Sequence, residues 1–134
     1  GKKMSKSYNN VIDIFLSDKK LRKQIMSIKT DSLSLESKKN AEACNVYNLY
    51  KLFASEDQTS NLKKKYHGGN FGYGQAKQEL FDLICQTYRK ERESFNYLIN
   101  NVDVIEEELK NGAIKARKIA QTVLQRVRKN IGYY

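Results

Sequence analysis

The C-terminal part of the chain repeats apolar residues at spacings of three and four over residues 102–130, without a proline to interrupt the pattern. Side chains at such spacings share one side of an α-helix, because successive residues are about 100° apart. The apolar positions are Ile105, Leu109, Ala113, Ala116, Ala120, Val123, Leu124, Val127 and Ile131. Lys110, Arg117, Gln121 and Arg128 form a polar stripe that faces away from them. A long amphipathic helix is therefore predicted, with Asn101 or Asp103 as its N-cap.

The same spacing predicts further helices upstream. Ser17 can cap a helix that continues to about Lys29, and Ser55 with Gln58 forms the capping-box pattern of a short helix ending near Tyr66. The other two expected helices cover residues 41–53 and 74–100, and residues 30–40 are expected to be a loop. No segment alternates as a strand would. The sequence predicts an all-α fold, a helical bundle of about five helices preceded by a short irregular loop segment.

The charge of the chain points to a polyanionic partner. Lys and Arg total 25 against 15 acidic residues, which gives a formal net charge of +10. Nucleic acid is the expected partner, and a merely solvated basic surface is the alternative. The apolar runs are too short to span a bilayer, and Cys44 and Cys85 lie too far apart in sequence to suggest a disulfide framework or a zinc spacing. We therefore expect a cytoplasmic protein with reduced thiols and no membrane partner.

One short motif carries chemistry. Lys3, Met4, Ser5, Lys6 and Ser7 match all five positions of the KMSKS signature of class I aminoacyl-tRNA synthetases. When an amino-acid carboxylate attacks the α-phosphate of ATP, negative charge builds on the departing pyrophosphate. Lysines on a mobile loop can stabilise that charge, and serine hydroxyls add hydrogen bonds. A disordered basic start to the chain is the competing interpretation.

Later motifs narrow the resemblance. In chain order they are Tyr8-Asn9-Asn10, Thr30-Asp31-Ser32, Cys44-Asn45 before residues 49–53, and Gly72-Tyr73-Gly74 leading into Lys77. Together with the signature, this order resembles the tryptophanyl-tRNA synthetase family. The absence of any proline departs from the family pattern near Ser17. On this resemblance, residues 1–16 are the KMSKS loop and connector of a catalytic domain, and residues 17–134 are a C-terminal helical domain that binds the tRNA anticodon.

The resemblance implies the chemistry of a longer enzyme. That enzyme would activate tryptophan with ATP and Mg²⁺ and transfer it to tRNA(Trp). Lys6 would contact the pyrophosphate in the transition state, Lys3 would support it, and the loop around Met4 would lie near adenine. The family's HIGH motif needs two histidines, and this chain has only His67. The isolated segment is therefore expected to be inactive and to hold no cofactor. The resemblance implies a homodimer for the full-length enzyme, whereas we expect the segment alone to be a monomer.

Several features have competing interpretations. A free-standing basic helical module that binds RNA or acts as a scaffold, without a ligase role, is the alternative to the ligase. Among basic residues, Lys110, Arg117 and Arg128 are the preferred tRNA contacts, ahead of the clusters 63–65 and 89–92. The glycines of residues 68–74 are expected to form a connecting turn and not a phosphate loop. No carboxylate or cysteine cluster accompanies His67, so no metal site is predicted. Most tyrosines are expected to pack in the core and not to stack on bases.

Overall fold

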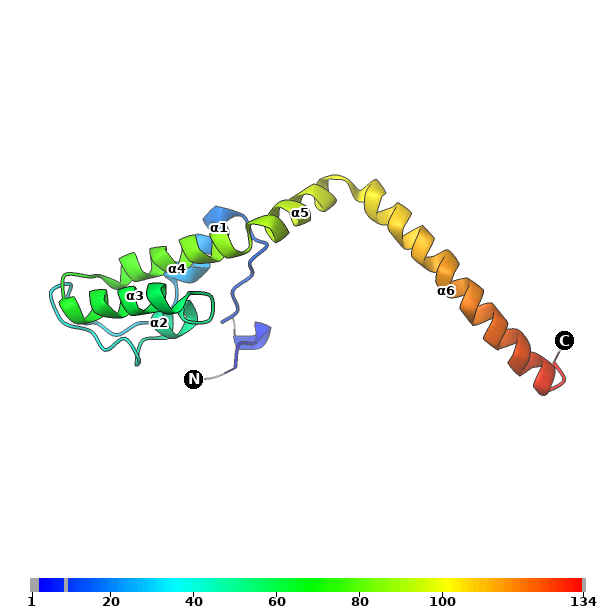
Figure 1. Ribbon diagram of the computed structural model, residues 1–134, viewed down its shortest axis with the longest axis horizontal. Helices are drawn as coiled ribbons and strands as arrows, with labels where there is room; N and C mark the ends of the chain where they lie inside the picture. The colour runs from blue at the N-terminus through cyan, green and yellow to red at the C-terminus, as the bar shows by residue number, and fades with distance from the viewer. Residues whose placement is uncertain (1–2, 9, 134) are drawn as a thin grey trace. The chain divides into compact units, whose positions relative to one another are not determined.

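The computed structural model describes residues 3–8 and 10–133 (Figure 1). The all-α prediction is confirmed, because the described residues form helices and no strand. The chain forms two compact units, Gly1–Arg92 and Glu93–Tyr134. The helices are a 3-10 turn η1 (Lys6–Tyr8) and then α1 (Asp18–Met26), α2 (Asn45–Tyr50), α3 (Glu56–Gly68), α4 (Tyr73–Thr87), α5 (Arg89–Asn100) and α6 (Val102–Asn130).

The first unit is built around α4. Both α1 and α2 pack against α4, and α3 packs against α2. The most deeply buried large side chains are Tyr47, Tyr66, Leu21, Ile25, Leu62, Leu80, Ile84 and Val46. The expected packing of tyrosines is confirmed for Tyr47 and Tyr50, which are buried in this core. Cys44 is buried, Cys85 is half-buried, and both thiols are free.

The helix around Val46 is shorter than its periodicity predicts. It covers Asn45–Tyr50 where residues 41–53 were expected. Two side chains bind the backbone before it: Asn40 Oδ1 accepts from the Glu42 amide at 3.1 Å, and Asn48 Nδ2 donates to the Glu42 carbonyl at 3.0 Å. Such bonds offer the backbone an alternative to helical bonding. A turn therefore replaces the first expected helical residues.

The long helix expected over residues 74–100 is divided into α4 and α5 at Tyr88. This residue has φ −103° and ψ 23°, outside helical values. Its ring packs edge-on against Phe53, with ring centroids 6.0 Å apart. Neither glycine nor proline stands near Tyr88, so the local sequence contained no signal for a break.

The ends of α6 agree with the prediction for residues 102–130. Asn101 occupies the N-cap position, but its side chain donates to the Tyr97 carbonyl at 2.7 Å and not to the first turn of α6. No residue of α5 or α6 is buried. Among the described residues, no helix is both long and apolar enough to cross a bilayer.

Candidate functional site

The segment Lys3–Ser7 closes on itself through Asn10. The Ser5 amide donates to Asn10 Oδ1 at 2.7 Å, and Asn10 Nδ2 donates to the Lys3 carbonyl at 3.5 Å. The hydroxyl oxygens of Ser5 and Ser7 are 2.7 Å apart, and the Tyr8 amide donates to the Ser5 carbonyl at 3.1 Å. The Lys3 and Lys6 side chains remain exposed. The loop therefore presents two ammonium groups and two hydroxyls to any anion that approaches it.

A short strap, residues 10–17, joins this loop to α1. Its half-buried side chains Ile12, Ile14 and Leu16 pack against the core of the first unit. The Asp13 amide donates to Gln24 Oε1 at 3.0 Å, and the guanidinium of Arg92 donates to the Ile14 carbonyl. The strap is thus held by apolar contacts and by two long polar side chains.

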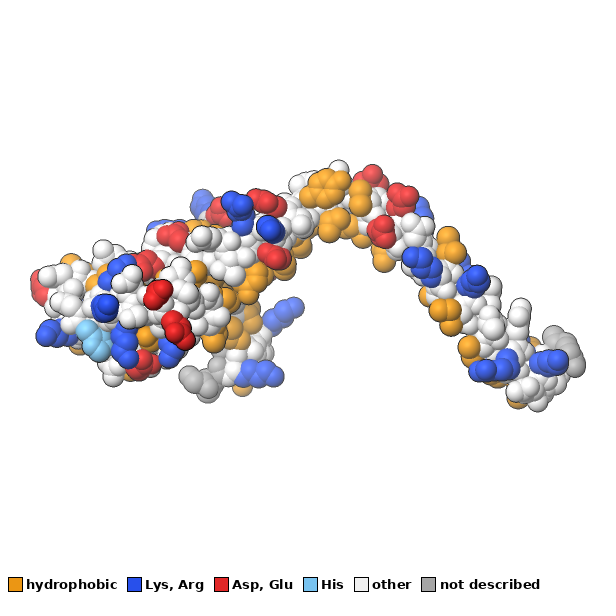
Figure 2. Space-filling model, in the orientation of Figure 1, with side chains coloured by type: hydrophobic (Ala, Val, Ile, Leu, Met, Phe, Trp, Pro, Cys, Tyr) orange, Lys and Arg blue, Asp and Glu red, His pale blue; other side chains and the backbone are white. Residues whose placement is uncertain are grey.

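The predicted RNA contacts share one face of α6. Lys110, Arg117 and Arg128 are exposed, and within the described part of the chain none of the three forms an ion pair. At about 1.5 Å per residue, the stripe from Lys110 to Arg128 is about 27 Å long. The acidic side chains of α6 gather at its N-terminal end, as Figure 2 shows. Residues 109–134 contain no Asp or Glu and the following Lys and Arg: Lys110, Lys115, Arg117, Lys118, Arg126, Arg128 and Lys129. This half of the helix has a strongly positive surface.

Two lysines of the 63–65 cluster in the first unit form ion pairs within their own fold. Lys63 and Lys51 both contact the Glu42 carboxylate, at 2.9 and 3.3 Å. Hydrogen bonds from Lys63 and then Lys51 lower the pKa of Glu42. Lys65 pairs with Glu79 at 2.7 Å. Because Lys51, Lys63 and Lys65 already pair with carboxylates, they are poorer candidates for binding phosphate than the stripe on α6.

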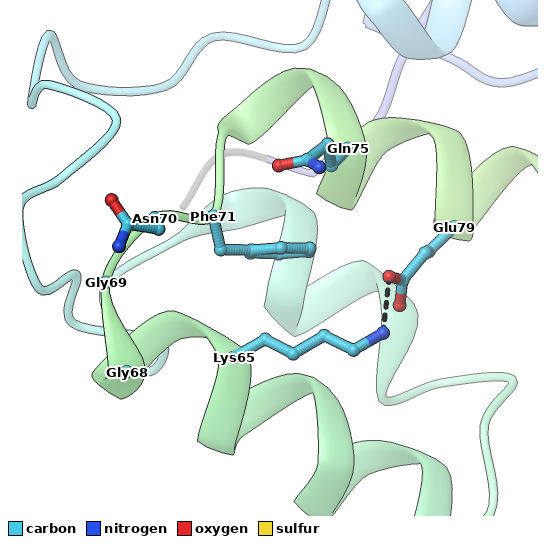
Figure 3. Close-up of a pocket in the computed structure, with 7 residues that line it drawn as sticks. All are labelled: Lys65, Gly68, Gly69, Asn70, Phe71, Gln75 and Glu79. Atoms are coloured by element: carbon cyan, nitrogen blue, oxygen red, sulfur yellow. Dashed lines mark hydrogen bonds and ion pairs between the residues drawn. The ribbon is translucent and has the colours of Figure 1, made fainter.

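The Gly-rich turn between α3 and α4 borders a shallow pocket of about 380 Å³ (Figure 3). Its lining is Lys65, Gly68, Gly69, Asn70, Phe71, Gln75 and Glu79. Gly69 ends α3 with φ 77°, and the Gly72 amide donates to Gln75 Oε1 at 2.8 Å at the start of α4. Figure 3 shows the Lys65–Glu79 ion pair on the side of the pocket away from Asn70. These contacts support the predicted connecting turn.

His67 lies on the surface beside Lys38, Lys39 and Asn40, in a second hollow of about 530 Å³. In the described residues, no group of three or more His, Cys, Asp or Glu side chains could hold a metal ion.

Lys39 is a buried cation that the sequence did not reveal. Its side chain is 3% exposed, and Nζ donates to the carbonyls of Ser34, Ser37 and Leu35 at 2.8, 3.0 and 3.2 Å. Nζ also lies 5.4 Å from the centre of the Tyr73 ring. A lysine in a Ser- and Lys-rich segment is expected to be solvated, so only the folded loop shows its role.

Comparison with known proteins places this helical unit and its basic loop in a family. A family model described as tRNA synthetases class I (W and Y) matches residues 1–89. The chain belongs to this class I tRNA synthetase family. Tryptophan–tRNA ligase of Campylobacter jejuni strain RM1221 is 46% identical over 132 residues, covering 98% of this chain and 41% of the relative. The ligase of Fusobacterium nucleatum is 43% identical, with 98% and 40% covered.

Solved structures give the same result. The crystal structure of tryptophanyl-tRNA synthetase from Campylobacter jejuni superposes with a TM-score of 0.92 and 45% identity, over 98% of this chain and 43% of that chain. A second structure of that enzyme, complexed with ADP and tryptophan, also has a TM-score of 0.92 and covers 41% of its chain. The chain thus spans about two fifths of the length of the relatives it matches.

Proposed function

We propose that this chain is the C-terminal part of a tryptophan–tRNA ligase, an enzyme that activates tryptophan with ATP and attaches it to tRNA(Trp). The observation that carries the proposal is the 46% identity to such a ligase across 98% of the chain. In this proposal, residues 1–16 are the ATP loop and its connector, and residues 17–134 are the anticodon-binding helical domain.

The loop suits one step of that chemistry. When the tryptophan carboxylate attacks the α-phosphate of ATP, the bond to the β-phosphate breaks and charge develops on pyrophosphate. Lys6 would contact that charge, Lys3 would support it, and the main chain around Met4 would lie near adenine. Both lysines are exposed, and the hydroxyl oxygens of Ser5 and Ser7 on the same loop are 2.7 Å apart. Residues 3–8 include no carboxylate, so Mg²⁺ would enter with the phosphates of ATP and not through this loop.

The α6 stripe would serve the other substrate. Lys110, Arg117 and Arg128 are exposed cations without carboxylate partners in the described structure, on a segment that contains no acidic residue. Such a face binds phosphates, and phosphate contacts set the register in which other side chains read bases. We propose that it contacts tRNA(Trp).

The test is amino-acid-dependent exchange of pyrophosphate into ATP by the full-length protein that contains this chain. We expect exchange with tryptophan and none with tyrosine. Lys6→Ala should lower kcat by about 100-fold, the typical cost of losing one transition-state charge contact. Lys19→Ala, at an exposed lysine on α1, is the matched control and should leave exchange unchanged.

A free-standing basic RNA-binding or scaffold module is the second candidate, favoured by the unbroken positive charge of residues 109–134. The same assay separates the two. Exchange with tryptophan excludes the module, whereas tight tRNA binding without any exchange by the full-length protein would reject the ligase.

A further inference from the structure

Arg92 joins two segments that lie far apart in the chain. Nη1 donates to the Ile14 carbonyl, and Nη2 lies 2.5 Å from the Asp18 carboxylate, so the contacts cross 78 and 74 residues. The Arg92 side chain is 13% exposed, whereas Asp18 is 76% exposed. An ion pair with so exposed a carboxylate stabilises the fold little. The planar guanidinium instead fixes geometry, because its donors point in set directions.

A second side chain holds the strap one residue earlier. Gln24, on α1, accepts from the Asp13 amide at 3.0 Å. Asp13 in turn accepts from the Phe15 amide at 3.0 Å, which tightens the backbone on either side of Ile14. Two consecutive residues of the strap are thus bonded to two different helices, α1 and α5.

The distance from these anchors to the ATP loop is short. Asn10 closes the loop at Ser5, and only three peptide links separate Asn10 from Asp13. Three links span at most about 10–11 Å. Any movement of the loop as a unit must therefore occur within those few residues while the anchors hold.

We propose that Arg92 is a positioning residue for the ATP loop, acting with Gln24 through the strap. The inference rests on the proposed function of Lys3–Ser7. Release of Ile14 would let the loop occupy a wider range of positions and lower the fraction of time that its lysines meet the pyrophosphate. Such a loss falls on the transition state, so it lowers kcat and leaves the KM for tryptophan unchanged.

The experiment compares Arg92→Gln with Arg22→Gln in the full-length enzyme. Arg22 also joins two helices, since its Nε donates to Gln78 at 2.8 Å, a bond between α1 and α4 that does not involve the strap. The same Arg→Gln change therefore removes one side-chain contact between two helices in each variant: Arg92 with Asp18, and Arg22 with Gln78. We expect R92Q to lower kcat for tryptophan-dependent pyrophosphate exchange about tenfold and R22Q to change it less than twofold. R92K, which keeps the charge and part of the bonding, should recover part of the rate.

Two further measurements keep the test decisive. Gln24→Ala should lower kcat in the same direction, and it serves in place of R92Q if that variant does not fold. Hydrogen exchange of the Asp13 and Phe15 amides should quicken in R92Q and not in R22Q. Wild-type kcat in R92Q, or an equal loss in R22Q, overturns the role of Arg92. Absence of exchange in the wild-type enzyme instead overturns the proposed function itself.

Discussion

The Tyr66 hydroxyl lies 3.4 Å from the Cys44 sulfur in the buried core of the first unit. Tyr66 is 0% exposed, and its ring packs against three other aromatic rings at centroid distances of 5.6 to 6.2 Å: Tyr47, Phe71 and Tyr73. Burial first, and then the contact with Cys44, raise the pKa of Tyr66 above its ordinary value. The folded state therefore holds this phenolic proton more tightly than the unfolded state does.

Tyr66 predicts alkaline sensitivity. The phenol is protonated in both states below pH about 10, so its contribution is fully present there. Above that pH only the unfolded chain loses the proton, and stability falls by about 1.4 kcal/mol per pH unit until the folded phenol ionises as well. Urea unfolding of wild type and Tyr66→Phe from pH 8 to 11 measures this. The variant should lose less stability above pH 10 than wild type, and equal losses would contradict the prediction.

Lys39 should matter more to stability than its neighbour Lys38. Lys39→Met keeps the length of the side chain but leaves three carbonyls without their charged donor. Hydrogen bonds to charged groups contribute about 1.5–3 kcal/mol, so we expect a loss on the order of 2–3 kcal/mol in denaturant unfolding. Lys38→Met, at an exposed position, should stay within about 0.5 kcal/mol of wild type. Similar losses in both would show that the three carbonyls are solvated at little cost.

Gly68 and Gly69 are adjacent but should respond oppositely to alanine. Gly69 has φ 77°, and a Cβ there would lie 2.7 Å from the Glu36 carbonyl oxygen. Gly69→Ala should therefore cost at least about 1–2 kcal/mol. Gly68 is the last residue of α3, before the C-cap Gly69, and a Cβ on Gly68 would meet nothing within 4 Å. Gly68→Ala should stabilise the protein by about 0.4–1 kcal/mol through a less flexible unfolded chain. Thermal unfolding of the two variants should thus shift the midpoint in opposite directions.

Two serines at helix starts make a second matched pair. Ser55 Oγ accepts from the Gln58 amide at 3.3 Å, and Gln58 Oε1 accepts from the Ser55 amide at 2.9 Å. Ser17 occupies the N-cap of α1 without a side-chain bond. Ser55→Ala should cost about 0.5–2 kcal/mol, whereas Ser17→Ala should be nearly neutral. Chemical denaturation of both variants checks this, and an equal cost at Ser17 would show that it caps α1 in solution.

These serines also show how far sequence patterns reach. A capping box at Ser55 was predictable because both partners stand three residues apart in one segment. At Ser17 the residue type and position indicated the cap correctly, but the side-chain bond did not form. The contacts of Arg92 with Ile14 and Asp18 cross more than 70 residues, and no local period encodes them. Residue spacing can predict a local capping box, such as the one at Ser55. Contacts between residues far apart in the chain, such as those of Arg92, become visible only in the folded structure.

The same limit applies to the candidate sites. The residues Lys3–Ser7 indicate an ATP loop, which stays a prediction, whereas the period of α6 correctly placed three exposed cations on one face. Neither pattern indicated that Asn10 closes the loop or that Gln24 holds the strap, because an amide side chain is compatible with many local roles. The break at Tyr88 likewise coincides with a long-range contact, the packing of its ring on Phe53, and not with a breaker residue.

The α6 stripe should contribute much of the salt dependence of tRNA(Trp) binding. The triple variant K110Q/R117Q/R128Q removes three cations from one face of the helix. The control K115Q/K118Q/K129Q removes the same charge from α6, at positions about 80–140° around the helix by the 100° period. If each stripe residue neutralises one phosphate, the slope of log K against log salt should become shallower by about 2 in the first variant. At low salt, the affinity of this variant for tRNA should also fall more than that of the control.

The control should keep most of the slope. The slope reports counterions released at phosphate contacts, whereas long-range attraction depends only on the net charge, which both variants change equally. Equal slopes in the two variants, measured with the full-length enzyme, would mean that α6 attracts tRNA only through its overall charge and that the stripe makes no specific contact.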